Sequence, residues 1–135
     1  MNMKEAVTSV LFKKYNDINS RASRSEYWWY ALFSFLAALL CQSLDALFGW
    51  QFGQPDAMGN RSGVLLSLFY VATFIPAICV AVRRLHDVNR SGWWMLITFT
   101  IIGLIPLTYW MIKKPEDSED GRENKWGKNP LLNEL

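Results

Sequence analysis

Three long apolar runs constrain the fold of this chain more than any other feature of its sequence. They cover residues 27–50, 64–82 and 93–112, and Asp45 is the one charged residue inside them. As helices, which rise about 1.5 Å per residue, the runs would extend roughly 36, 29 and 30 Å. Because the hydrocarbon core of a bilayer is about 30 Å thick, each run is long enough to cross it.

The pattern inside the runs predicts helices and not the strands of a membrane barrel. The runs lack the alternation of apolar and polar residues, and they are about twice as long as a barrel strand. Apolar residues make up 51% of the 135-residue chain and include seven Trp, more large side chains than a soluble domain of this size can bury. The sequence therefore predicts an all-α integral membrane bundle with three apolar spans.

The third run contains two residues that commonly interrupt helices, Gly103 and Pro106. They could break the run into a re-entrant hairpin, which would return the tail to the side from which the run started. A run of about 20 residues is too short for two full crossings, however, and this favours a single span. The sequence leaves both alternatives open.

Basic residues are distributed unequally around the runs. They collect before the first run and between the second and third, whereas Arg61 alone lies between the first and second. Cytoplasmic loops carry an excess of lysine and arginine, so we expect a cytoplasmic N-terminus. Three spans would place the tail outside, although the tail is basic as well. Its cations are Lys113, Lys114, Arg122, Lys125 and Lys128.

The chain divides into three parts along its length. Residues 1–20 carry apolar side chains at helical spacing, which predicts a short amphipathic helix, either in the membrane interface or docked on the cytoplasmic face. Residues 21–112 form the transmembrane domain, and residues 113–135 form a charged polar tail. No removable signal peptide is expected, because the first residues lack an apolar core segment.

Local signals mark the starts of two helices. Ser23 followed by Glu26 fits a capping box ahead of the first run, in which the Glu26 carboxylate would reach back to the Ser23 amide. Ser91 fits an N-cap for the third run. Trp28 and Trp93 follow these caps, and tryptophans at such positions are typical of the membrane interface.

Few residues in the chain suggest catalysis. One histidine and two cysteines, Cys41 and Cys79, do not make a metal-ligand set. The cysteines lie at different depths in their runs, so we expect two free thiols. Phosphate-binding loops, zinc-protease motifs and serine-nucleophile motifs are missing. We therefore expect a protein that is not an enzyme and has no cofactor, and its net charge of +2 gives no reason to expect nucleic acid.

Most of the polar chemistry lies in one stretch, RRLHDVNRSGWW, at residues 83–94. Its arginines suit the cytoplasmic headgroup region. Glu26 could pair with Arg83 or Arg84 across the mouth of the bundle. The candidate partners of Asp87 are Arg84, Arg90 and Arg24.

His86 is the only histidine of the chain. It is either a proton carrier or a loop residue whose hydrogen bonds are satisfied within the protein. The candidate functional or ion-pair cluster consists of Arg24, Glu26, Arg83, Arg84, His86, Asp87 and Arg90.

Asp45 is a separate candidate for an intramembrane polar site, near the expected outer end of the first run. Acidic residues inside a membrane often mark ion or proton sites. Near an interface, a carboxylate can instead face water or a neighbouring helix. Both interpretations of Asp45 are compatible with the sequence.

Several of these segments resemble the bacterial inner-membrane family known as domain of unknown function 805. The segments that carry the resemblance are residues 21–28, 83–94, 105–107 and 121–130. The likeness covers nearly the whole chain from about residue 12. It implies a small multi-pass helical bundle in the bacterial inner membrane, and it implies no mechanism, since the function of the family is not established.

Two kinds of function fit the sequence. The first is a non-enzymatic membrane module that binds lipid headgroups or a partner protein, which the basic and aromatic segment favours. The second is a subunit of an oligomeric pore or carrier for a small solute or ion, which Asp45, Pro76 and His86 favour. The expected partners are membrane lipids and either further copies of the chain or another membrane protein.

Overall fold

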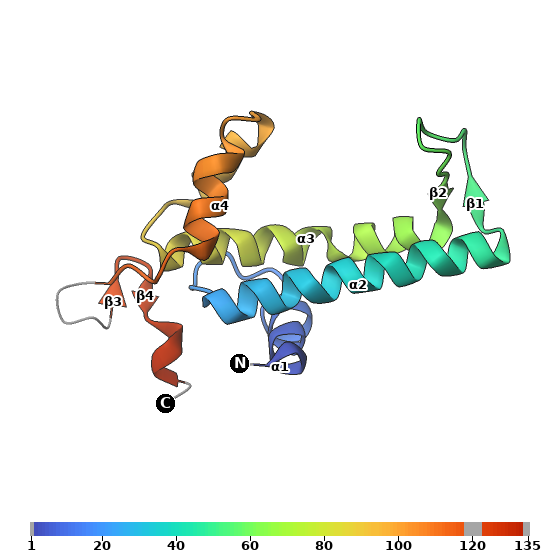
Figure 1. Ribbon diagram of the computed structural model, residues 1–135. Coiled ribbons are helices and arrows are strands. Elements are labelled where there is room, and N and C mark those ends of the chain that lie inside the picture. The colour runs from blue at the N-terminus through green and yellow to red at the C-terminus, as the bar shows by residue number, and fades with distance from the viewer. Residues whose placement is uncertain (1, 118–122, 134–135) are drawn as a thin grey trace. The chain divides into compact units, whose positions relative to one another are not determined.

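The computed structural model describes residues 2–117 and 123–133, and these residues are mostly helical, as the sequence predicts (Figure 1). The α-helices and the strands are α1 (Met3–Thr8), α2 (Arg24–Phe48), β1 (Gln51–Phe52), β2 (Ser62–Gly63), α3 (Val64–Asp87), α4 (Leu104–Ile112), β3 (Glu123–Asn124) and β4 (Gly127–Lys128). The other helical segments are the π-helix η1 (Ser9–Lys13) and the 3₁₀ helices η2 (Gly92–Phe99) and η3 (Pro130–Asn133).

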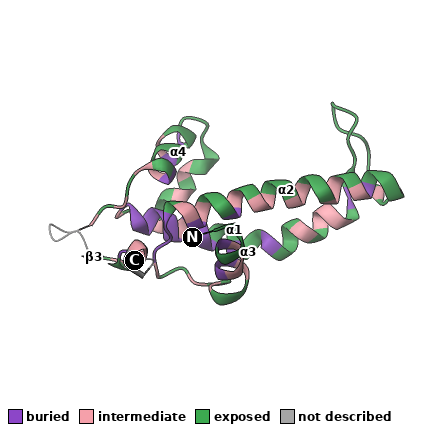
Figure 2. Cartoon of the chain, turned by 60° about the horizontal axis from the view of Figure 1, so that its bottom comes forward, coloured by how far each residue is buried: buried purple, intermediate pink, exposed green. Residues whose placement is uncertain are grey.

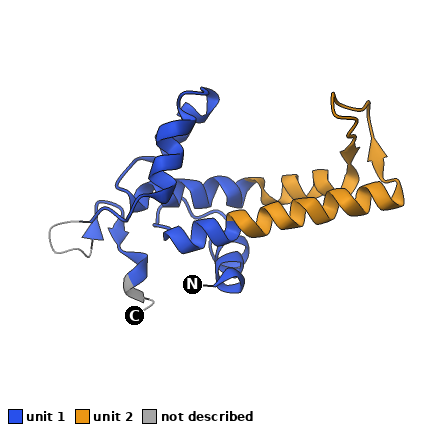
Figure 3. Ribbon diagram, in the orientation of Figure 1, with its two compact units in different colours: residues 1–30, 75–135 blue, residues 31–74 orange. Residues whose placement is uncertain are grey.

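The chain forms two compact units (Figure 3). The first comprises residues 1–30 and 75–135, and the second comprises residues 31–74. The candidate cluster lies entirely within the first unit, and Asp45 lies within the second. The two candidate sites are therefore separate features of the molecule.

Among the described residues, two helices, α2 and α3, are long and apolar enough to cross a membrane, judged by length and composition. Only 6% and 22% of their most apolar windows are buried inside the protein, and Figure 2 shows exposed and half-buried residues along most of α2. A core helix of a soluble protein would be mostly buried, so these surfaces fit contact with lipid. The helix α3 also continues past the expected end of its span to Asp87.

The third apolar run does not form one helix, so the single crossing expected for residues 93–112 is replaced by η2, a turn and α4. The turn requires Gly103, because an added Cβ would lie 2.1 Å from the carbonyl oxygen of Ile97. Pro106 lies in the first turn of α4, where a missing amide hydrogen removes no helical hydrogen bond. The three-span bundle is not confirmed, and the break that the sequence suggested is present.

The helix α4 packs back on the end of α3. Leu107 and Met111 of α4 form a buried cluster with Ala81 and Leu85 of α3. This contact brings the last turn of α4 to the charged end of α3. The apolar tip of the hairpin remains uncovered, since Phe99 and Ile101 are 89% and 88% exposed.

The N-terminal segment docks on the first unit. Ala6 and Val10 are fully buried, and the Ser9 hydroxyl donates to Glu26 of α2 at 2.9 Å. These contacts hold the N-terminal segment against the start of α2. A reciprocal capping box between Asn2 and Glu5 caps the N-terminus of α1.

In the second unit, a short antiparallel hairpin of β1 and β2 joins α2 to α3. The helix α2 ends with Gly49 in the left-handed region at φ 70°, and the amide of Trp50 donates to the carbonyl of Asp45 at 2.9 Å. This is the glycine-terminated helix end known as a Schellman motif. The two cysteines are free thiols, as expected.

Candidate functional site

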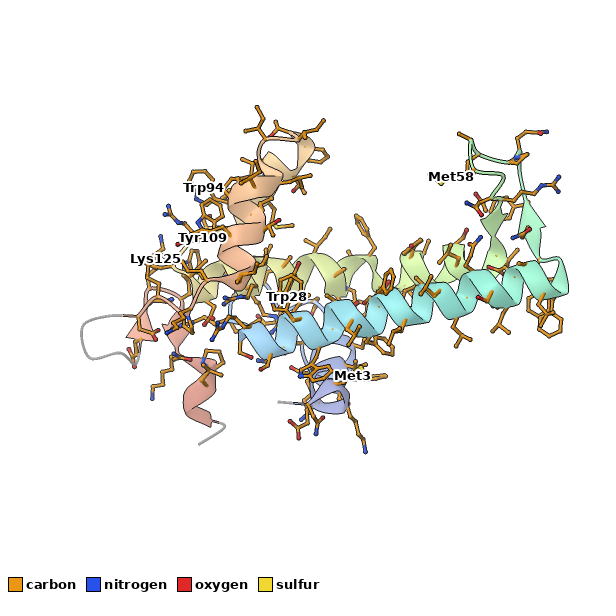
Figure 4. The ribbon with its side chains drawn as sticks, in the orientation of Figure 1. Met3, Trp28, Met58, Trp94, Tyr109 and Lys125 are labelled. Carbon is orange, nitrogen blue, oxygen red and sulfur yellow. The ribbon has the colours of Figure 1, made fainter. Side chains whose placement is uncertain are left out.

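The start of α2, the end of α3 and the end of α4 meet in the first unit, and the tail after α4 joins them. Figure 4 shows the side chains there, with Trp28, Trp94 and Lys125 labelled. Several of these groups are charged and buried, a combination that soluble and membrane proteins accept only when the charges are paired. Their pairing therefore determines what the cluster can do.

Glu26 forms the first buried pair with Arg83, one of the two partners suggested by the sequence. The Arg83 Nη1 lies 2.8 Å from the Glu26 Oε1, and the Ser9 hydroxyl donates to the same oxygen at 2.9 Å. The capping box is only half present, since Ser23 accepts from the Glu26 amide at 3.2 Å while the Glu26 carboxylate is taken by Arg83. A buried guanidinium competes better for that carboxylate than a backbone amide does.

Asp87 forms the second set of buried ion pairs, one with Arg21 and one with Arg84. Arg21 donates to its Oδ1 from Nε at 3.0 Å and from Nη2 at 2.8 Å, and Arg84 pairs with its Oδ2. The suggested pairs of Asp87 with Arg90 and Arg24 are not formed. Arg21 also lies 2.6 Å from a carboxylate oxygen of Asp117 in the tail.

Arg84 and Trp28 cap the end of α4. The last carbonyl groups of a helix have no partner inside it. The Arg84 Nε donates to the Met111 carbonyl at 3.2 Å, Trp28 donates its indole N–H to the same carbonyl at 3.1 Å, and Arg84 also donates to the carbonyl of Lys113. The Arg84 guanidinium therefore holds α4 against α3 and also pairs with Asp87.

His86 is fixed between a loop and the tail. Its Nδ1 lies 3.0 Å from the Ser20 carbonyl oxygen, and its ring stacks on Trp126 with centroids 3.8 Å apart and an interplanar angle of 5°. Asn124 donates from its side chain to the His86 carbonyl at 2.9 Å. The tail is thus fastened to the end of α3.

The stretch after α3 is a second Schellman motif. Asn89 lies in the left-handed region at φ 57°, and the Arg90 amide donates to the Leu85 carbonyl at 2.8 Å. This ending turns Arg90 away from the ion pairs, so that its guanidinium lies over the rings of Trp94 and Trp110 at 5.8 and 5.1 Å. Ser91 then caps η2, as expected, by accepting from the Trp93 amide at 3.4 Å.

The loop before α2 is closed by Asp17. Its carboxylate accepts from the Asn19 amide at 2.9 Å, from the Ser20 amide at 3.2 Å and from the Ser20 hydroxyl. Partial burial alone would raise the pKa of Asp17, but these hydrogen bonds outweigh it and lower the pKa below its ordinary value. This loop presents the Ser20 carbonyl to His86.

Arg24 stands apart from the buried pairs. Its side chain is exposed. Within residues 2–117 and 123–133, none of the carboxylates pairs with it, and its side chain donates one hydrogen bond, to the Ile112 carbonyl at 3.5 Å. It lines a hollow of about 470 Å³ with Ser25, Trp28, Ile112 and Leu131. This hollow combines an exposed cation with an apolar wall.

Asp45 is placed by the structure at the start of α3 in the second unit. It is fully buried, and its two oxygens accept from the amides of Leu65 and Leu66, each at 3.0 Å. Both oxygens therefore cap the positive end of α3. Gly63 lies directly against the carboxylate, because an added Cβ would come 1.9 Å from its Oδ2.

Sequence reasoning missed four members of the cluster: Ser9, Arg21, Asp117 and Trp126. Arg21 and Trp126 carried a signal, since they belong to the first and last family-like segments. Ser9 and Asp117 lie outside those segments, where local spacing gives no sign of a contact. In the described part of the chain, no group of three or more potential metal ligands is present, and residues 121 and 122 of the last family-like segment lie outside it.

Comparison with known proteins gives matches over most of the chain. A family model described as "Protein of unknown function (DUF805)" matches residues 15–128. The inner membrane protein YhaH of Escherichia coli is 32% identical over 124 residues, which cover 90% of this chain and 93% of YhaH. The inner membrane protein YhaI of the same organism is 28% identical over 122 residues, with 89% and 91% coverage. No solved structure gives a significant match.

Proposed function

The chain belongs to the DUF805 family of membrane proteins, and we propose that it is a non-enzymatic inner-membrane module that binds the headgroup of an anionic phospholipid in the hollow beside Arg24. The observation that carries the proposal is the contrast between Arg24 and its neighbours. Arg21, Arg83 and Arg84 are buried and paired with carboxylates, whereas Arg24 is exposed at a hollow and has no carboxylate partner among the described residues.

The proposal includes a membrane arrangement. Contacts within the first unit join the start of α2, the end of α3 and the tail, so these three lie on the same side of a membrane crossed by α2 and α3. Both ends of the 92–112 hairpin also lie at the end of α3, since Gly92 lies against Val82 and Met111 is bonded to Arg84. The hairpin then enters and leaves one leaflet, and the basic tail is cytoplasmic, as is the N-terminus.

In this arrangement the hollow lies at the level of the headgroups. Arg24 and Ser25 belong to the first turn of α2, where the unpaired amides and the helix dipole favour an anion. Trp28 and Ile112 provide an apolar wall, and a tryptophan is well suited to the boundary between acyl chains and headgroups. A phosphate held by the guanidinium and the Ser25 amide would leave the acyl chains along this wall.

The proposal is tested by the lipids that the purified protein retains. Native mass spectrometry of the protein, released from nanodiscs of equal phosphatidylglycerol and phosphatidylcholine, should show bound phosphatidylglycerol. Because a charge-assisted hydrogen bond at a half-open site contributes about 1 kcal/mol, Arg24→Ala should weaken retention about five-fold.

The matched control is Arg61→Ala, which removes an equally exposed cation in the second unit. It should leave phosphatidylglycerol retention unchanged. Equal loss in the two variants would mean that net charge, and not the hollow, attracts the lipid. Equal retention of phosphatidylcholine by the unaltered protein would also refute the proposal.

The pore or carrier hypothesis has no comparable support in the described residues. Its main candidate, Asp45, uses both carboxylate oxygens to cap α3. An ion that replaced these amides would have to uncap a 24-residue helix. Lipid binding is the function that the geometry favours.

A further inference from the structure

A second hollow, of about 390 Å³, lies on the first unit and shares no lining residue with the hollow beside Arg24. Its lining includes Ile18, Ile78, Val82, His86, Trp93 and Trp126. Apart from His86, none of its lining residues has an ionisable side chain. An uncharged ligand therefore fits it better than a phosphate or a carboxylate does.

Two polar atoms of this lining lack a partner among the described residues. A neutral imidazole that donates through Nδ1 to the Ser20 carbonyl can only accept through Nε2, and no described group donates to that nitrogen. The indole Nε1 of Trp126 is buried and has no hydrogen-bond partner. The two rings stack in parallel with their centroids 3.8 Å apart, so the acceptor and the donor belong to adjoining rings.

A hydroxyl group matches this pair of atoms. It can donate its hydrogen to the His86 Nε2 and accept from the Trp126 N–H at the same time. A carbonyl oxygen could only accept, and an ammonium group could only donate. An unsatisfied buried indole N–H is unfavourable, so a ligand that accepts a hydrogen bond from it is favoured.

The apolar part of the lining shows where the rest of such a ligand would lie. Ile78, Val82 and His86 follow one another at intervals of four residues, so they form a single stripe along α3. The stripe runs about 12 Å from His86 into the apolar part of the helix. Trp93 and Ile18 flank it and are largely exposed.

We propose that this hollow binds a lipid with an uncharged hydroxyl headgroup, whose hydroxyl bridges His86 and Trp126 and whose acyl chain follows the stripe of Ile78 and Val82. This site is separate from the one proposed for the anionic phospholipid and does not depend on it. The bound form of the ligand needs no proton transfer, since His86 stays neutral.

The chain has a single histidine, which makes the test direct. Histidine labelled with ¹⁵N would be observed by NMR in the full-length protein in phosphatidylcholine nanodiscs. Before addition of lipid, Nδ1 should be protonated and Nε2 should not. Titration with dioleoylglycerol should shift the Nε2 resonance saturably, whereas the same lipid acetylated at its hydroxyl should leave that resonance unchanged.

Variants separate the bridge from general lipid contact. Trp126→Phe keeps the stack on His86 but removes the N–H, so dioleoylglycerol should bind about five-fold more weakly. Ile78→Trp fills the lower part of the groove and should abolish the shift. Arg61→Ala, which lies outside the lining of this hollow, is the control and should bind dioleoylglycerol as the unaltered protein does.

Three results would overturn the proposal. One is a His86 ring protonated at Nε2 before any lipid is added. Another is an equal shift with the acetylated lipid, which would show contact without the hydroxyl bridge. The third is an unchanged affinity in both Trp126→Phe and Ile78→Trp when the folded NMR spectrum is retained.

Discussion

Breaking the pair between Glu26 and Arg83 gives the sharpest test of the buried cluster. Both side chains are at most 2% exposed, and the nitrogen and oxygen lie 2.8 Å apart. Glu26→Gln keeps the size of the side chain and an acceptor for Ser9, but it leaves Arg83 without a carboxylate. Two of the Arg83 nitrogens, Nε and Nη2, already lack a partner among the described residues, so no second contact can compensate.

The expected magnitude follows from the burial. Unit charges about 4 Å apart attract by about 4 kcal/mol at an effective dielectric constant near 20, and removing one member of a buried pair costs about 3–5 kcal/mol because the other charge is left unpaired. Glu26→Gln and Arg83→Met should each lower the free energy of unfolding by that amount. The double variant should be more stable than either single variant, because it leaves no isolated charge.

The assay is reversible unfolding of the protein in nanodiscs, followed by steric trapping or by tryptophan fluorescence, for the two single variants and the double variant. Glu5→Gln is the control, since Glu5 is exposed and its carboxylate accepts from Asn2 in a capping box that glutamine can also complete; it should change the free energy by less than about 0.5 kcal/mol. Strictly additive losses in the double variant would refute the reasoning, because they would mean that Glu26 and Arg83 do not interact.

Three further changes should have distinct effects. Gly103→Ala should open the hairpin turn, because its Cβ would lie 2.1 Å from the Ile97 carbonyl oxygen; a spin-label distance measured across the hairpin should increase, and an unchanged distance would contradict the turn geometry. Asp45→Ala should cost about 1–3 kcal/mol of unfolding free energy and Asp45→Asn about 1 kcal/mol or less, since asparagine still caps a helix; equal losses would contradict the capping role. The lowered pKa of Asp17 means that its contribution to stability is present above its ordinary pKa of 3.8 and is lost as the pH falls through the folded value; Asp17→Asn should therefore flatten the acid limb of the stability profile, and an unaltered limb would contradict the assignment.

The sequence predicted the elements whose stability is local. Hydrophobic length identified α2 and α3, and cap chemistry identified Ser91 and the Ser23 half of the box at Glu26. These features depend on neighbours within a few residues, which one sequence displays directly. The same is true of the break at Gly103, although only the structure shows that the turn excludes a Cβ.

The tertiary pairings could not be predicted in the same way. Arg21 is separated from Asp87 by 66 residues and Trp28 from Met111 by 83, and a single sequence does not say which distant cation meets which carboxylate. The docking of the tail was the least predictable of these contacts, because its mixed charges fit a solvated segment as well as a docked one. Asp117, Asn124 and Trp126 dock the tail on Arg21 and His86.

Arginines near the ends of the spans can have two roles, which are to set the orientation of the protein in the membrane and to bind an anionic ligand. A count of basic residues does not distinguish these roles, but the buried cluster does. Orientation in the membrane depends on lysine and arginine near the ends of the spans, and Arg21, Arg83 and Arg84 contribute to that count whether or not they are later paired. After folding, these three are buried against Glu26, Asp87 and Asp117, so they offer no charge to a ligand. Under the proposed topology, recognition of an anion therefore falls to Arg24, an exposed arginine that lines the hollow with Trp28. A substitution at Arg83 should then act through stability, whereas a substitution at Arg24 should act through lipid binding with stability nearly unchanged.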